Sequence, residues 1–282
     1  MLLLFKYYSR KYGRSLIQVN IEQLQQQYNE KRRQEKRKIF AFQFVILIGL
    51  LLLWEVTTHF RILDPLIFSS PRAVGSMFIA KVSDGSLFPH IAITMFETVV
   101  GFILGTLFGT LLAISLWSSK TFADVMDPYL VVLNAMPKVA IGPIILVIFG
   151  PNMLAVLVMG VLISVIISTL VIFSAFQQVN ENYVKVMQLF GASKYETFRH
   201  VILPASTPTI ISTLKVNVGL SWVGVIVGEF LVSSSGLGYL IISGFQVFNF
   251  TLVFLALLII IVLATIMYKG VEMIERKVLE KQ

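Results

Sequence analysis

Long apolar stretches alternate with short polar connections along this chain of 282 residues. A membrane-spanning helix requires about 20 mostly apolar residues, because each residue adds about 1.5 Å to a hydrocarbon layer about 30 Å thick. Such stretches are read as helices, because open strands would leave backbone groups unpaired in lipid. Six stretches meet this length: residues 39–58, 93–117, 129–149, 153–173, 210–231 and 250–268. We therefore predict an all-α integral membrane protein with six transmembrane helices.

Composition agrees with a chain that lies mostly in lipid. Hydrophobic residues make up 56% of the sequence and charged residues 13%, whereas a soluble domain has about 25% charged residues. The chain has no Cys, which excludes disulfides and thiolate metal sites. Its three His, at positions 59, 90 and 200, lie too far apart in the sequence to form a local pair of metal ligands. Nothing in the sequence argues for metal chemistry.

Positive charge is concentrated at the start of the chain. The formal net charge is +8, and residues 1–38 hold ten Lys or Arg against three Glu. This arm ends in EKRRQEKRK directly before an apolar stretch, a position typical of a cytoplasmic segment near anionic lipid headgroups. Nucleic acid is a weaker explanation, because the basic cluster lacks the aromatics on which bases stack. We expect membrane lipids, and no nucleic acid, as a partner of the arm.

Orientation follows from the basic residues in the connections between spans. With the N-terminus inside, the cytoplasmic segments hold 18 Lys or Arg and the external segments hold three, at positions 61, 72 and 81. This asymmetry predicts that both termini are cytoplasmic. The resulting division is a basic cytoplasmic arm over 1–38, a transmembrane domain over 39–268 with a long cytoplasmic loop at about 177–208, and a cytoplasmic tail over 269–282.

The long cytoplasmic loop contains signals for two short helices. Asn180 or Asn182 can cap a first helix through YVKVMQLF, and Gly191 follows where a left-handed terminating residue costs little. Ser193 then begins a capping box with Glu196.

The second helix is expected to run from this capping box to Pro204, because proline supplies no amide and disfavours helix at the preceding residue. Helical spacing leaves Lys194 and His200 among its more exposed positions. A loop of this kind is often only a well-capped connector between spans.

The order of residues in this loop resembles a known family. Gly191, nine further residues and then Val201-Ile202-Leu203-Pro204 are similar to the EAA loop of ABC importer permeases. Further segments resemble the permeases for nitrate, taurine, aliphatic sulfonates and related small nutrients: LDPLIFSSPRAV, TMFETVVGFILGTLFG, NAMPKVAIGPIILVIFG and VGEFLVSSSGLGYLI. The resemblance implies the type I ABC importer permease fold and a bacterial cell membrane location. It also implies a permease homodimer, a pair of cytoplasmic ABC ATPases and an extracytoplasmic substrate-binding protein. Besides binding lipid, the basic arm could contact the ATPases or regulate them.

The resemblance also implies which residues couple the permease to its ATPase. They are Lys185, Val186, Met187, Gly191, Ala192, Ser193, Val201, Leu203 and Pro204. The triplet Lys185-Val186-Met187 departs from the Glu-Ala-Ala of the family, so the usual acidic contact is replaced by a base. We expect the ATPase either to offer a carboxylate opposite Lys185 or to lack an ionic contact there.

The chain itself is expected to be neither an ATPase nor another enzyme. It contains no Gly-Lys dipeptide, so a Walker A loop that would cradle phosphates is absent from the sequence. ATP and Mg²⁺ are therefore expected on the partner ATPase, with no cofactor on this chain. Two other classes of protein are alternatives. An ion-coupled secondary transporter would be favoured by an inverted repeat between the two halves, and none is visible. A membrane-embedded enzyme would need a catalytic cluster, which the scattered His do not offer.

Polar residues within the spans are candidates for a solute pathway, because buried charge in lipid requires a partner or water. These candidates are Asn134, Lys138, Lys215, Asn217 and Glu229. Asn134 and Lys138 would share a face at i and i+4 of one helix, although Lys138 follows Pro137 and could equally mark an unwound turn. A cation on the pathway would suit an anionic solute. Glu97, Lys215 and Glu229 are also explained by snorkelling or pairing near an interface.

Small residues recur at helical spacing in two spans, at Gly101, Gly105 and Gly109 and again at Gly224 and Gly228. Such spacing permits close approach of helices. Packing within one subunit is favoured over a special role at a dimer axis.

Overall fold

A computed structural model describes residues 2–232 and 234–279, with side chains from residue 25 onward except those of Lys138 and Leu279. The chain divides into two compact units, Met1–Leu63 and Asp64–Gln282. The first unit holds α1 (Leu2–His59). The second holds α2 (Pro65–Phe68), α3 (Pro71–Ser83), α4 (Leu87–Ser118), α5 (Lys120–Ala135), η1 (Lys138–Ile141), α6 (Gly142–Phe149), α7 (Met153–Gln177), α8 (Glu181–Leu189), α9 (Lys194–Thr197), η2 (Phe198–Ile202), α10 (Leu203–Val232), α11 (Leu237–Gln246) and α12 (Phe250–Leu279).

The helix α1 joins the basic arm to the first apolar span without interruption. It runs for 58 residues, so residue 38, where we place the end of the arm, is not marked by a break in the helix. At the other end of the chain α12 likewise continues beyond its apolar part, to Leu279. Both predicted cytoplasmic extensions are therefore helical over their described residues.

The number of spans agrees with the sequence, with one correction. Five described helices are long and apolar enough to cross a membrane, and a sixth span results if α5 and α6 are counted as one. The third predicted span, over 129–149, is not one continuous helix, because its two pieces are bent by 96°. Met136 precedes Pro137 and has extended backbone, with ψ 137°. The proline ring disfavours helical backbone at the preceding residue, so α5 ends at Ala135.

Three helices, α4, α7 and α10, form the centre of the second unit. Gly160 of α7 lies between Gly101 of α4 and Gly224 of α10: a Cβ added to Gly101 would lie 3.6 Å from the Gly160 Cα, and one added to Gly224 would lie 2.7 Å from it. Gly105 and Gly109 similarly face Ser164 and Ser168 of α7. The predicted role of the small residues in packing within the subunit is confirmed.

Buried polar side chains also join these three helices. The hydroxyls of Ser164 on α7 and Ser221 on α10 are 3.0 Å apart. The Asn217 amide on α10 donates to Ser168 of α7 at 2.6 Å and to Thr106 of α4 at 2.9 Å. Groups that cannot reach water are thereby paired across the helix contacts, which favours one relative arrangement of α4, α7 and α10.

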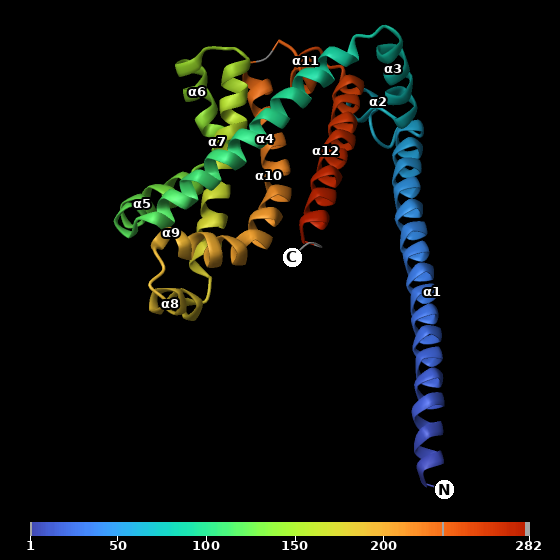
Figure 1. Cartoon of the computed structure of the whole chain (residues 1–282). Helices are drawn as coiled ribbons and strands as arrows, with labels where there is room; N and C mark the ends of the chain where they lie inside the picture. Colours follow the sequence, from blue (N-terminus) through green and yellow to red (C-terminus); the bar gives the residue numbers. More distant parts are fainter. Residues whose placement is uncertain (1, 233, 280–282) are drawn as a thin grey trace. The chain divides into compact units, whose positions relative to one another are not determined.

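The two ends of this helix group carry different features. Figure 1 shows α8 and α9 beyond one end of α7, with α6 and the turn before α11 near the other end. At the α6 end, α11 leads into α12, and the hydroxyl of Ser69, directly after α2, is 2.9 Å from that of Thr251 on α12. The polar loop that we singled out in the sequence therefore lies at one end of the three central helices.

Candidate functional site

The first helix of the loop, α8, begins and ends as its capping residues predict. The carboxamide oxygen of Asn180 accepts the backbone N–H of Asn182 at 2.9 Å, so Asn180 is the cap. Gly191 follows the helix with φ +77°, a left-handed conformation that costs residues with a Cβ about 1–2 kcal/mol. An isolated nine-residue helix would be marginal in water, so these end signals define where α8 lies.

The short helix α9 begins with the predicted capping box. The Glu196 amide donates to the Ser193 hydroxyl at 3.2 Å, and the Ser193 amide donates to the Glu196 carboxylate at 2.7 Å. These hydrogen bonds from the amide and hydroxyl of Ser193 hold the pKa of the Glu196 carboxyl below its usual value. Glu196 is thus expected to be ionised at neutral pH and to keep the turn between α8 and α9 closed.

The predicted end of the second helix at Pro204 is wrong. The chain passes from α9 through the π-helical turn η2 into α10, and Pro204 is the second residue of α10. In η2 the amide of Leu203 donates to the Phe198 carbonyl, five residues earlier. The wider turn lets the helix continue past a residue that lacks an amide, so the loop is joined to α10 by continuous helix.

Apolar side chains on and just after α8 face outward. Tyr183, Val186, Leu189 and Phe190 are exposed, the last two by 87% and 85%. In contrast, Val184 packs inward against a buried cluster that includes Ile202. Exposed apolar side chains on a polar, capped loop are typical of a surface that binds another protein. We call these four residues the α8 apolar face.

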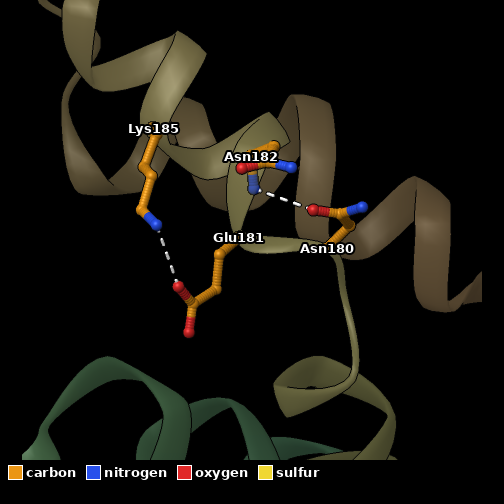
Figure 2. Close-up of polar contacts among 4 residues, drawn as sticks. All are labelled: Asn180, Glu181, Asn182 and Lys185. Atoms are coloured by element: carbon orange, nitrogen blue, oxygen red, sulfur yellow. Dashed lines mark hydrogen bonds and ion pairs between the residues drawn. The ribbon is translucent and has the colours of Figure 1, made fainter.

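An ion pair lies beside the α8 apolar face. The Lys185 ammonium contacts the Glu181 carboxylate at 3.1 Å, one helical turn earlier (Figure 2). Both side chains are largely exposed, by 63% and 83%, and exposed pairs at this spacing are worth about 0.3–0.5 kcal/mol. Lys185, the base that replaces the acidic residue of similar loops, therefore has an acidic neighbour in its own helix. Separating this ion pair would cost little free energy.

The side chain of Lys194 links the loop to α4. The Lys194 ammonium donates to the carbonyl of Ser118, the last residue of α4, at 2.6 Å, and lies 5.6 Å from the centre of the Trp117 ring. Carbonyls at the end of a helix lack partners within the helix and attract cations. Trp117 also stacks against Phe198, with ring centres 4.8 Å apart. The sequence carried no signal for this contact, because its partners are 76 residues apart.

The candidate pathway residues of α10 have separate partners. The Lys215 ammonium pairs with Glu275 of α12 at 2.8 Å, Asn217 belongs to the central packing described above, and Glu229 accepts a hydrogen bond from Thr94 of α4 at 2.7 Å. Lys215 is thus bonded to α12, whereas Asn217 and Glu229 are bonded to separate residues of α4. A shared role of the three side chains in a solute pathway stays a prediction.

The other two pathway candidates do not share a helical face. Asn134 lies in α5, which ends one residue later, and residue 138 begins η1 beyond Pro137. The i and i+4 relationship holds only within one continuous helix, so that part of the prediction is wrong. The side chain of Lys138 lies outside the described ones. Its backbone position agrees with the alternative of an interrupted turn.

Comparison with known proteins identifies similar chains. Residues 105–280 match the family model described as binding-protein-dependent transport system inner membrane component. A probable ABC transporter permease protein of Haemophilus influenzae is 30% identical, over 83% of this chain and 96% of that protein. A putative aliphatic sulfonates transport permease protein of Bacillus subtilis is 26% identical, over 88% and 91%. A solved bacterial ABC transporter involved in the import of the acidic polysaccharide alginate has the same fold, with a TM-score of 0.61 at 14% identity, over 87% of this chain and 99% of that chain.

Proposed function

The chain belongs to the binding-protein-dependent permeases of ABC importers, and we propose that its loop over 177–208 is the element through which a separate ATPase drives transport. Family membership makes it a multi-pass membrane component and a non-catalytic subunit that binds no cofactor. It also implies an ATPase and a substrate-binding protein as partners. The ion-coupled secondary transporter, our alternative from the sequence, is thereby set aside.

The observation that carries the proposal is the α8 apolar face. Leu189 and Phe190 are almost fully exposed, although they lie on a polar loop outside the apolar spans. Burying a Leu or Phe side chain contributes about 1.5–3 kcal/mol relative to leaving it exposed. A partner with a complementary cleft would gain this free energy, and a cytoplasmic ATPase is the partner that the family provides.

The connections of the loop suit it to transmit movement. Continuous helix through η2 links it to α10, and the contact of Lys194 with Ser118 links it to α4. A displacement of α8 by the ATPase would therefore reach two of the three central helices. We propose that these helices move as rigid units between inward-facing and outward-facing states.

For the solute we propose a small anion, with an aliphatic sulfonate as the first candidate and taurine and nitrate next. The support is the Bacillus subtilis relative, a putative aliphatic sulfonates transport permease protein that is 26% identical. We further propose a homodimer with both termini in the cytoplasm. The orientation rests on the excess of Lys and Arg in the segments assigned to the cytoplasm.

The coupling proposal is tested by purifying the full-length tagged chain from its native membranes and measuring how much ATPase accompanies it. We expect the double variant Leu189→Glu, Phe190→Glu to lose at least ten-fold of the bound ATPase, because two charges replace the buried apolar contact. The matched control is Leu66→Glu, which changes an equally exposed leucine, 77% accessible, on α2. Full retention of the ATPase by the double variant would refute the proposed surface.

The solute proposal needs a separate measurement. In vesicles that contain the complete complex with its binding protein, uptake of a radiolabelled alkanesulfonate should require ATP inside the cytoplasmic compartment. Uptake that proceeds without ATP would refute ATP-driven transport. No sulfonate uptake while another class of solute is carried would refute the assignment of sulfonate.

A further inference from the structure

Two buried carboxyl groups meet near the end of the central helices where α4 and α7 begin and α10 ends. Glu97 of α4 is 1% exposed and Glu229 of α10 is 0% exposed. Thr94, one helical turn before Glu97 on α4, donates to Glu229, so the two carboxyl groups lie on facing sides of the same helix contact and interact directly. Two carboxylates in a buried place would repel one another. We therefore expect the pair to hold one proton, which a hydrogen bond between two carboxyl groups requires.

The surrounding hydrogen bonds indicate which carboxyl carries that proton. One Glu229 oxygen accepts the Thr94 hydroxyl at 2.7 Å, and the same hydroxyl oxygen accepts the Leu237 amide at 2.7 Å. The other Glu229 oxygen accepts the Gly238 amide at 2.5 Å. Glu229 thus accepts hydrogen bonds on both oxygens, as an ionised carboxylate does. This leaves Glu97 as the protonated acid that donates to it.

The turn between α10 and α11 is built around the Glu229 carboxylate. Gly236 has φ +108°, and a Cβ on Gly236 would overlap the carboxyl atoms of Glu229. A Cβ on Gly238 would lie 2.8 Å from the same carboxylate. The two glycines are needed for the backbone to approach this closely. The position of the turn therefore depends on the charge and place of Glu229.

The side chain of Glu97 also borders a cavity. Its second oxygen, Oε2, is buried and has no hydrogen-bond partner among the described residues. Glu97 lines a cavity of about 210 Å³ together with Asn152, Ser234 and Ser235. Water occupies about 30 Å³ per molecule in the liquid, so this cavity has room for several. Water in the cavity would lie beside the Glu97 side chain.

We propose that Glu97 is a proton-binding site whose proton holds α4 against the turn between α10 and α11. With the proton bound, Glu97 donates to Glu229 and the buried pair carries one negative charge. When the proton passes to water in the cavity, two carboxylates face one another in a buried place and repel. The contact between α4 and the turn then separates, and rebinding of the proton restores it.

Other titratable groups lie near this site and have to be distinguished from Glu97. His90 of α4 accepts the Gly236 amide at 3.0 Å, and its ring stacks on Tyr239 of α11, with centres 6.0 Å apart. Lys81 of α3 lies within electrostatic reach of His90. From α7, the cavity is lined by the uncharged Asn152 and Met153. Among the described titratable groups, Glu229 is the one that acts on the Glu97 carboxyl.

Infrared spectroscopy tests the proposal on the full-length chain in lipid. The difference between spectra at neutral and strongly alkaline pH should contain the C=O stretch of one protonated carboxyl that is lost on titration. We expect Glu97→Gln to abolish this band, because glutamine keeps a donor for Glu229 but has no acid proton. His90→Gln should retain it. A band that persists in Glu97→Gln, or vanishes only in His90→Gln, would overturn the assignment.

A second variant covers the case in which Glu97→Gln fails to fold. Glu97→Asp keeps the acid on a shorter side chain, so the band should remain and shift in frequency; an unshifted band would also overturn the proposal. In the assembled importer, we expect transport by the unchanged protein to fall at alkaline pH and transport by Glu97→Gln to lose this fall. The infrared result depends on neither the ATPase nor the solute, so the proton site and the proposed function can fail independently.

Discussion

The contact of Lys194 with the end of α4 gives a quantitative prediction for the variant Lys194→Met. This change removes the hydrogen bond to Ser118, the cation near the helix end and the interaction with the Trp117 ring. A hydrogen bond to a charged donor is worth about 1.5–3 kcal/mol, a cation at a helix end about 0.3–1 kcal/mol, and an exposed cation–π contact about 0.5–1 kcal/mol. These contributions overlap, and Lys194 is partly solvated.

We therefore expect a total loss of about 1–2 kcal/mol, which is a factor of about 5–30 in the equilibrium between α9 docked on α4 and α9 detached. Amide hydrogen exchange measures this equilibrium directly. The amides of residues 194–202 should exchange faster in Lys194→Met by that factor. Lys194→Arg, which keeps a charged donor, should recover part of the protection.

The matched control is Lys185→Met in the same loop, because the ammonium of Lys185 pairs with the exposed Glu181 of its own helix. It should change exchange in α9 by less than about two-fold, in line with the small free energy of an exposed pair. Equal exchange rates in Lys194→Met and the unchanged chain would refute the reasoning. A similar acceleration in Lys185→Met would show that charge in the loop, and not the contact with α4, is responsible.

Three further substitutions test the local structure. Gly191→Ala should destabilise the turn after α8 by about 1–2 kcal/mol, because φ is +77° there, and faster limited proteolysis would detect this. Gly224→Leu should prevent a monodisperse preparation, because even a Cβ would lie 2.7 Å from Gly160, whereas Gly219→Leu, with no atom within 4 Å, should elute normally. Ser193→Ala should cost about 1 kcal/mol of capping and speed exchange of the Glu196 amide. Unchanged proteolysis of Gly191→Ala, normal elution of Gly224→Leu or unchanged exchange in Ser193→Ala would contradict the corresponding prediction.

Local signals in the sequence predicted much of the fold. Apolar length located the spans, and the side chains of Asn180 and Ser193 marked the starts of α8 and α9. These predictions succeeded because the determining groups lie within a few residues of one another. The same locality explains the two errors in backbone course. Apolar length did not reveal that the third span bends at Pro137, and the π-helical turn before Pro204 required knowledge of how α10 packs.

The contacts that carry the proposed mechanisms were beyond local reasoning. Lys194 is exposed as predicted, but the bond of its ammonium to a carbonyl 76 residues earlier was not predicted. Glu97 and Glu229 were explained by snorkelling or pairing near an interface, but the sequence did not indicate that they pair with one another. Pairing of this kind is decided by which helix faces meet, which one sequence without related sequences does not specify.

The glycine contacts among α4, α7 and α10 have a mechanical consequence. Where backbones touch through Gly101, Gly160 and Gly224, there is no rotamer to change and no gap into which one helix can slide. We therefore expect the three helices to move as a single block during a transport cycle. Bending has to take place elsewhere, and the interruption between α5 and α6 is the place where the helical hydrogen bonds are already broken. Spin labels on α4 and α10 would keep their separation, while a label on α6 would move relative to both.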